Sequence, residues 1–313
     1  MDGTRREALA WATGGTIALA AAAPARAAVR ARPRLGMNLY LFTDAVTPDF
    51  YPLLRTLKRL GFDGVEIPIT RGHAERFGEL RRVLDDEGLA CTTLSSLKPE
   101  ANPVSPDPAV RAAAVDALRW AIDTGHQLGS QTLSGPLYAA SDAFTGKAPT
   151  TDELARSADV LAQACAYAKP AGQTLCLEFL NRFEAYLVNT VAQTLALIER
   201  TGADNLAIAY DTHHAHIEEG SATGSVRAAG AKLHHTHISE SHRGTLGTGQ
   251  VNWPAIFGGL DAIGYAGWLM VEGFSTDVEP LAKSAHVWRD VFPSKEEVAR
   301  DGLAFLRKWT AAR

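Results

Sequence analysis

The sequence has few cysteines, no excess of basic residues and, beyond its N-terminal region, no long hydrophobic run. Its three cysteines, Cys91, Cys165 and Cys176, form no closely spaced pair of the kind found in zinc sites, so we interpret them as small buried residues. The net charge is −4, with 31 basic and 35 acidic residues, which argues against a nucleic-acid-binding protein. After the N-terminal region no segment approaches the roughly 18 consecutive apolar residues of a membrane span, so we expect no stable membrane insertion.

Residues 1–27 differ in composition from the rest of the chain. Arg5 and Arg6 are followed by a mildly apolar stretch rich in alanine and glycine, and then by Ala25-Arg26-Ala27. This order is typical of a cleavable signal peptide, and the paired arginines resemble a twin-arginine export signal. We therefore expect a periplasmic or extracellular protein whose mature chain begins near Ala28, which N-terminal sequencing of the exported protein would test. The alternatives are the general secretory route and an uncleaved N-terminal extension.

From residue 35 onward, short β-type runs alternate with helical patterns. The predicted strands cover 35–42, 64–69, 90–96, 131–137, 174–180, 206–212, 233–239 and 267–274. Strands that alternate with helices favour parallel pairing, and eight such units in about 280 residues are typical of a single (β/α)8 TIM barrel. The predicted barrel domain spans 35–313. An open doubly wound sheet is the alternative, but no Gly-x-Gly-x-x-Gly follows the first strand.

Four ionisable residues interrupt apolar strands close to their C-terminal ends. They are Glu178 in "LCLEFL", Asp211 in "LAIAYD", His237 in "LHHTHIS" and Glu272 in "WLMVEGF". The C-terminal ends of the strands meet on one face of such a barrel, so these side chains should lie close together. Three buried carboxylates would repel one another without a cation, and a divalent metal removes that cost. The sequence therefore predicts a metal site of mostly oxygen ligands, which suits Mn²⁺, Mg²⁺ or Co²⁺.

Other polar residues fall near the same strand ends. Seven of the ten histidines lie within 213–242, and among them His214 is predicted to bind substrate at the rim of the site, with a plain loop histidine as the alternative. His235 is predicted to lie in the barrel interior. Arg243, in a glycine-containing segment, offers a forked donor for hydroxyl or carbonyl oxygens, with a surface arginine as the alternative. Glu66 ends the second predicted strand and is expected either to line the pocket or to orient a ligand.

Four segments carry a family resemblance. They are "LEFLNRFEAYLVNT" (177–190), "YDTHHAHIEE" (210–219), "HISESHRGTLGTGQVNW" (237–253) and "GYAGWLMVEGF" (264–274). In this order they resemble the ketose 3-epimerase group of the xylose isomerase-like sugar isomerase/epimerase superfamily. The resemblance runs from residue 35 to the C-terminus. It implies a barrel enzyme that epimerises a ketose at C3 with a divalent metal, Mn²⁺ before Mg²⁺ or Co²⁺, and that assembles from identical subunits.

The resemblance also implies roles for individual residues. The family's metal ligands fall on Glu178, Asp211, His237 and Glu272, and its substrate-holding residues fall on Glu184, His214 and Arg243. Glu178 and Glu272 would in addition move the C3 proton between the two faces of the sugar through an enediolate. The segment "SGPLYAASDAF" (134–144) departs from several relatives, which carry an aromatic lid there, and Tyr138 is expected to take its place.

Other functions stay open on the same residues. A hydroxypyruvate isomerase-like or inosose dehydratase-like enzyme would use the same metal site, and an oxidised sugar or keto-glycoside met outside the cytoplasm is an alternative substrate. The segment 181–184, Asn-Arg-Phe-Glu, favours the epimerase. A noncatalytic periplasmic sugar-binding protein is the alternative from another class. It would not need Glu178 and Glu272 on either side of a metal.

Overall fold

The structure is a computed structural model that describes residues 32–70 and 76–311. The predicted signal segment 1–27 lies outside these residues, so export stays a prediction. Within the described ranges, no helix combines the length and the hydrophobicity that a membrane crossing needs.

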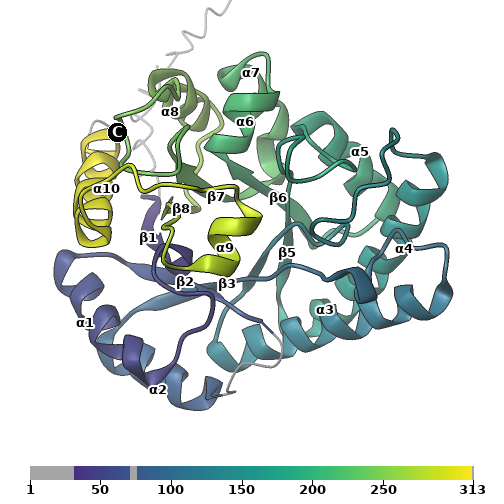
Figure 1. Ribbon diagram of the computed structural model, residues 1–313, viewed down its shortest axis with the longest axis horizontal. Coiled ribbons are helices and arrows are strands. Elements are labelled where there is room, and N and C mark those ends of the chain that lie inside the picture. The colour runs from purple at the N-terminus through teal and green to yellow at the C-terminus, as the bar shows by residue number, and fades with distance from the viewer. Residues whose placement is uncertain (1–31, 71–75, 312–313) are drawn as a thin grey trace, which may run out of the picture. The chain divides into compact units, whose positions relative to one another are not determined.

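The described strands pair in parallel, each with its neighbour along the chain, and the last strand closes onto the first. Figure 1 shows them in the middle of the molecule with helices around them. A strand overlaps each predicted range, and the predicted TIM barrel is confirmed. The strands are β1 (Arg34–Asn38), β2 (Gly64–Pro68), β3 (Ala90–Leu94), β4 (Thr132–Gly135), β5 (Thr174–Glu178), β6 (Leu206–Asp211), β7 (Leu233–Ser239) and β8 (Trp268–Glu272).

Helices follow the strands, and capping residues mark the ends of several of them. Before α4, Thr150 and Glu153 form a capping box in which each side chain bonds the other's backbone N–H. Gly129 ends α3 in the left-handed conformation, with φ +76°. The helices are α1 (Tyr51–Leu60), α2 (Phe77–Glu87), α3 (Pro108–Leu128), α4 (Thr151–Ala168), α5 (Val191–Thr201), α6 (Thr212–Glu218), α7 (Ala222–Ala229), α8 (Trp253–Ala262), α9 (Glu279–Ser284) and α10 (Lys295–Thr310).

Alternate strand residues face opposite sides of the barrel wall, and the two sides differ in chemistry. Outward-facing residues such as Met37, Val65 and Ile67 belong to one buried hydrophobic cluster that includes helix residues such as Leu54. The inner side holds many small or polar residues along the strands. Among these buried residues are Asn38, Glu66, Thr92, Ser134, Cys176, Ala207, Ala209, His235 and His237. This composition leaves room for chemistry inside the barrel.

Several strands end earlier than predicted. β1 ends at Asn38, four residues before the predicted end, because residues Leu39–Leu41 turn into a 3-10 helix. The Asn38 side chain caps that turn by accepting from Tyr40 N at 2.9 Å. The apolar residues beyond the strand pack into the core from the turn, which is why the apolar run continued past the strand end.

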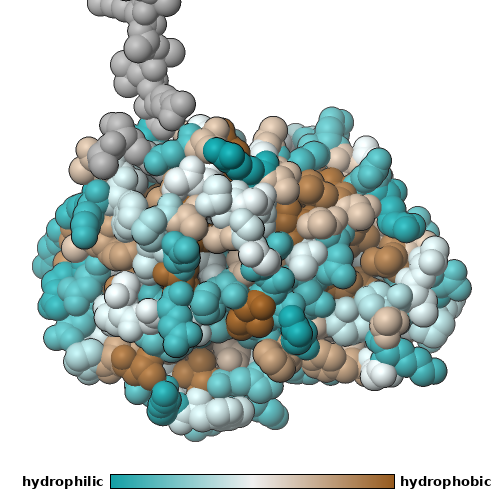
Figure 2. All heavy atoms as spheres, turned by 90° about the horizontal axis from the view of Figure 1, so that it is seen from above, coloured by the Kyte–Doolittle hydropathy of each residue, from teal (hydrophilic) through white to brown (hydrophobic). Residues whose placement is uncertain are grey.

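The surface is mixed in character. On the face shown in Figure 2, hydrophobic residues form separate small groups among hydrophilic ones. Large exposed hydrophobic side chains of the described chain include Phe144, Tyr167, Phe183 and Trp288. Scattered apolar residues of this kind are ordinary on a water-exposed surface.

Candidate active site

The four predicted metal-ligand side chains meet at the C-terminal end of the barrel. Glu178, Asp211 and Glu272 are the last residues of β5, β6 and β8, and His237 lies in β7 in register with Asp211. All four are buried, and one potential ligand atom from each lies within 4.8 Å of the others. His237 Nδ1 is 2.8 Å from Glu178 Oε1 and 3.3 Å from Glu272 Oε1. The structure therefore brings the predicted set together.

The backbone around Asp211 turns one of its oxygens toward the site. Asp211 is the N-cap of α6, and its Oδ1 accepts a hydrogen bond from His213 N at 2.8 Å. The other oxygen, Oδ2, accepts from Arg243 Nη1 at 2.6 Å. The capping bond fixes the side-chain rotamer, so Oδ1 caps the helix while Oδ2 faces the site.

The electrostatics of this cluster favour a cation. Burial raises the pKa of Glu178 and of Glu272, and it raises the pKa of Asp211 to about 6. Repulsion from a neighbouring carboxylate also raises the pKa of each of these groups, while attraction to His237 and Arg243 lowers it. Three carboxylates and an imidazole are a donor set that suits Mn²⁺, Mg²⁺ or Co²⁺, and a divalent ion would favour their charged forms. The residues present therefore fit a divalent metal.

Arg243 is buried against the same carboxylates, which the sequence did not predict. Its Nη1 donates to both Asp211 Oδ2 and Glu272 Oε2, each at 2.6 Å. Its Nη2 lies 3.0 Å from His214 Nε2, and its guanidinium carbon stands 4.8 Å from the centre of the Phe274 ring. Arg243 thus joins the predicted metal ligands to the predicted substrate-binding residues.

The segment that carries Arg243 is held by Glu240. Arg243 has φ +62°, a left-handed conformation that costs a non-glycine residue energy and needs support from its surroundings. The buried Glu240 carboxylate accepts from Ser241 N at 2.8 Å, Gly247 N at 2.9 Å and Trp253 Nε1 at 3.2 Å. Burial alone would raise the pKa of Glu240, but the backbone N–H groups outweigh it and lower the pKa.

We expect Glu240→Gln to lower the free energy of unfolding by about 1–3 kcal/mol at pH 7, because hydrogen bonds to a charged acceptor are lost. A lowered folded-state pKa means that the carboxylate stabilises the fold above its unfolded pKa, and that this contribution is lost as the pH falls through the folded value. Urea unfolding of both proteins at pH 7 and near pH 4 measures the difference, which should shrink at the lower pH. A difference that does not change with pH would contradict this account.

His214 lies inside the site rather than at its rim. It is buried in α6, and its Nδ1 accepts from Asn181 N at 3.1 Å. Burial and the neighbouring Arg243 guanidinium hold the pKa of His214 well below its usual value, so the ring is neutral. Asn181 Nδ2 also donates to Glu184 Oε1 at 2.7 Å. Asn181, which was not predicted as a site residue, therefore positions two residues that were.

The site opens onto a cavity of about 100 Å³, which is lined by two of the four predicted ligands, Glu178 and Glu272, and not by Asp211 or His237. Glu178 and Glu272 reach it from β5 and β8, and α9 contributes Leu281 and Ser284 from the segment after β8. Figure 1 shows α9 near the middle of the view, close to the ends of the strands. The other residues that line the cavity are Tyr40, Leu94, Ser96, Pro136, Ser141, Asp142, Leu180, Glu184, His214, Arg243, Phe274 and Ala285.

The expectation for Tyr138 as an aromatic lid is wrong. Its side chain is fully buried and does not line the cavity. The Tyr138 hydroxyl accepts from Leu180 N at 3.3 Å and donates to Val188 O at 3.2 Å. Tyr138 therefore supports the backbone that follows β5. The apolar edge of the cavity comes instead from residues such as Tyr40 and Phe274, whose ring centres are 5.9 Å apart.

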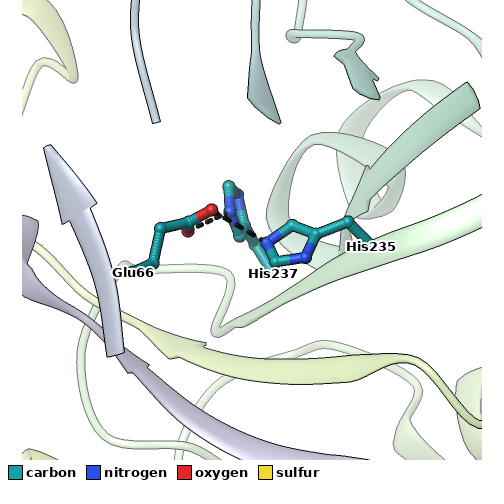
Figure 3. A group of neighbouring side chains, drawn as sticks. All are labelled: Glu66, His235 and His237. Atoms are coloured by element: carbon teal, nitrogen blue, oxygen red, sulfur yellow. Dashed lines mark hydrogen bonds and ion pairs between the residues drawn. The ribbon is translucent and has the colours of Figure 1, made fainter. Parts of the chain in front are cut away.

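A second layer of polar side chains lies deeper in the barrel. Glu66 of β2 is fully buried and does not line the cavity, so the expectation that it lines the pocket is wrong. The other expectation, that Glu66 orients a ligand, agrees with its position. Its partner is His237, and His235 stands beside them in the barrel interior, as predicted (Figure 3). Asn38 joins this layer and was not predicted, although as a polar residue ending an apolar strand it follows the same rule as the four ligands.

Comparison with known proteins places the chain in a family. Residues 54–309 match the family model described as xylose isomerase-like TIM barrel. The chain belongs to that family. An L-ribulose 3-epimerase of Mesorhizobium japonicum is 36% identical over 276 residues, which are 87% of this chain and 93% of that protein. A ketose 3-epimerase of Arthrobacter globiformis is 33% identical over 252 residues, which are 80% of this chain and 87% of that protein.

Structural comparison agrees with these relatives. A solved structure of L-ribulose 3-epimerase superposes with a TM-score of 0.85 at 36% identity, and the match covers 90% of this chain and 95% of that one. The predicted resemblance to ketose 3-epimerases is therefore confirmed.

Proposed function

We propose that this protein is a metal-dependent ketose 3-epimerase. Its relatives are named for that activity, and the observation that carries the proposal lies in the site itself. Glu178 and Glu272, from strands on different sides of the barrel mouth, flank His237 Nδ1 and both line the cavity. Two carboxyl groups that face one small cavity are what proton transfer to both faces of a sugar requires.

Glu178, Asp211, His237 and Glu272 would hold the ion, with Mn²⁺ as the first candidate and Mg²⁺ or Co²⁺ as alternatives. A bound divalent ion would supply Lewis-acid polarisation of the substrate's oxygens. The protein's own contribution is to present the four donors from a rigid set of strand ends, and to exclude water by burying them.

The proton moves between carboxyl groups and C3 of the ketose. One of Glu178 and Glu272 takes the C3 proton, and the electron pair of the C–H bond passes to the C2 carbonyl group to give an enediolate. The other, as a carboxylic acid, returns a proton to C3 from the opposite face while the C2 carbonyl re-forms. Burial raises the pKa of both groups above the ordinary glutamate value, which is the direction that helps a carboxyl group hold a proton between the two transfers.

The remaining residues would hold the sugar in register. Arg243 and the neutral His214 both line the cavity with Nη2 and Nε2 3.0 Å apart, and Glu184 lies next to them, 3.9 Å from the same Arg243 nitrogen. Together they suit the oxygens at the C1–C2 end of a ketose. The exact ketose would then be selected at the other end of the cavity, where Ser96, Pro136 and α9 form the wall.

Deuterium incorporation tests the reaction class. Mn²⁺-loaded protein incubated in D₂O with a panel of ketopentoses and ketohexoses should place deuterium at C3 of a ketose and produce its C3 epimer, as read by NMR. Protein treated with a chelator is the control.

The same spectra distinguish the alternatives. Deuterium at C1 alone with formation of an aldose would indicate an isomerase of the hydroxypyruvate isomerase type, and loss of water would indicate a dehydratase. Saturable binding of a ketose without exchange at any carbon would indicate a sugar-binding protein. Any of these outcomes would overturn the epimerase proposal.

A further inference from the structure

Behind the four proposed ligands lies a carboxylate that touches only one of them. Glu66 Oε2 is 2.6 Å from His237 Nε2 (Figure 3), whereas the other ring nitrogen, Nδ1, faces Glu178. Glu66 and His237 are both fully buried. The ring is therefore held between Glu66 at one nitrogen and the carboxylates of the cavity at the other.

The Glu66 carboxylate is fixed by several donors. Ser134 Oγ donates to Oε1 at 2.6 Å, Thr92 Oγ1 donates to the same oxygen at 3.3 Å, and Asn38 Nδ2 donates to Oε2 at 3.0 Å. His235 Nε2 lies 2.9 Å from Oε1, but its direction does not suit a hydrogen bond. Because both oxygens accept hydrogen bonds, the Glu66 carboxylate is held in one orientation, with Oε2 facing His237 Nε2.

A neutral imidazole carries a hydrogen on one nitrogen and a lone pair on the other, and its partners decide which. Carboxylates contact both ring nitrogens of His237, so the ion decides between them. With an ion bound among the carboxylates at Nδ1, that nitrogen would present its lone pair to the ion, and the hydrogen would lie on Nε2, where the Glu66 carboxylate accepts it. His237 Nδ1 is the nitrogen that faces Glu178 and Glu272. The lone pair thus points to where those carboxylates converge.

Asn38 extends this arrangement to a second ligand. Its Nδ2 donates to Glu66 Oε2 at 3.0 Å and to Glu272 Oε1 at 2.9 Å, and an amide has a hydrogen for each. Its Oδ1 is held by the backbone N–H of Tyr40. One hydrogen-bonded chain therefore connects His237, Glu66, Asn38 and Glu272.

We propose that Glu66 is a positioning residue that fixes His237 with its hydrogen on Nε2, so that Nδ1 is the metal-ligating atom, and that Asn38 ties this orientation to Glu272. The inference rests on the proposed metal site, and it adds a role to residues that touch neither the ion nor the substrate. The other reading of the cluster, a second ion held by Glu66, His235 and His237, is disfavoured because Ser134 and Asn38 already donate to the two oxygens of Glu66.

Metal affinity tests the proposal without reference to activity. Free Mn²⁺ is measured by its EPR signal during titration of the wild type, Glu66→Gln and Ser134→Ala. An uncharged amide supports the Nε2 hydrogen less well, so Glu66→Gln should weaken Mn²⁺ binding about 10–100-fold. Ser134→Ala is the matched control, since it removes a bond to the other Glu66 oxygen and leaves His237 in contact, and it should change the affinity by less than about threefold.

The outcomes separate this inference from the proposed function. If the wild type and Glu66→Gln bind Mn²⁺ equally well, the inference alone is overturned. The same holds if Ser134→Ala binds Mn²⁺ as weakly as Glu66→Gln does. Wild type that binds no Mn²⁺ would overturn the metal site and the inference with it. If Glu66→Gln does not fold, ¹⁵N NMR of histidine-labelled, Mg²⁺-loaded wild type decides the question. The spectrum should show a hydrogen on His237 Nε2, and a hydrogen on Nδ1 would overturn the proposal.

Discussion

Replacing Glu272 with glutamine should lower kcat for epimerisation by a factor of about 10²–10⁴. The amide keeps the size of the side chain but can neither take nor return the C3 proton. The substrate contacts proposed for Arg243 and His214 remain, so KM should change much less than kcat. Steady-state kinetics at saturating Mn²⁺ measure both, because saturation corrects for any weaker binding of the ion. Glu199→Gln, on the exposed side of α5, is the matched control and should leave both constants unchanged.

A two-carboxylate mechanism has a further signature in this variant. With Glu272 disabled, Glu178 can still remove and return the proton on its own face. One of the two C3 epimers should therefore exchange its C3 hydrogen for deuterium without inversion, while the other should exchange far more slowly. Glu178→Gln should show the opposite preference. A Glu272→Gln enzyme that epimerises at a rate close to wild type would rule out this assignment, as would equal exchange of both epimers.

The sequence predicted the parts of this site that follow from one rule of parallel barrels. Polar residues that interrupt apolar strands near their C-terminal ends had to face a common point, and Glu178, Asp211 and Glu272 are indeed the last residues of their strands. The same residues mark the strand ends more accurately than the apolar runs do. β5 and β8 each stop two residues before the predicted end, and Phe179 and Phe274 are buried although they lie outside the strands.

What the sequence could not predict depends on distances between side chains of different elements. Arg243 is far from Asp211 and Glu272 in the chain, yet one of its nitrogens contacts both. Tyr138 carries no signal that its hydroxyl meets the backbone of Leu180 and not the substrate. Asn38 stood in the middle of the predicted strand 35–42, so the strand-end signal that identified the four ligands did not apply to it until the structure placed the end of β1 at this residue.

Removing the metal should lower the stability of the protein as well as its activity. Three carboxyl groups are buried with one potential ligand atom of each within 4.8 Å of the others, so an ion that binds the folded state alone shifts the unfolding equilibrium. At a free Mn²⁺ concentration of 100 times Kd the gain is about 2.7 kcal/mol. For a chain of this size that corresponds to a rise in Tm of about 5 °C over the chelator-treated protein, at about 2 °C per kcal/mol. Thermal unfolding at several Mn²⁺ concentrations measures it.

The pH dependence and one variant identify the site responsible for that shift. Burial raises the pKa of Asp211 to about 6 and raises the pKa of Glu178 and Glu272, so protons compete with the ion as the pH falls. The Mn²⁺-induced rise in Tm should therefore shrink below about pH 6. Asp211→Asn removes one charged ligand without removing a proton-transfer group, and it should reduce the rise at pH 7. A wild-type Tm that does not respond to Mn²⁺, Mg²⁺ or Co²⁺, or an Asp211→Asn variant that responds as fully as the wild type, would contradict the assignment of the ion to these four residues.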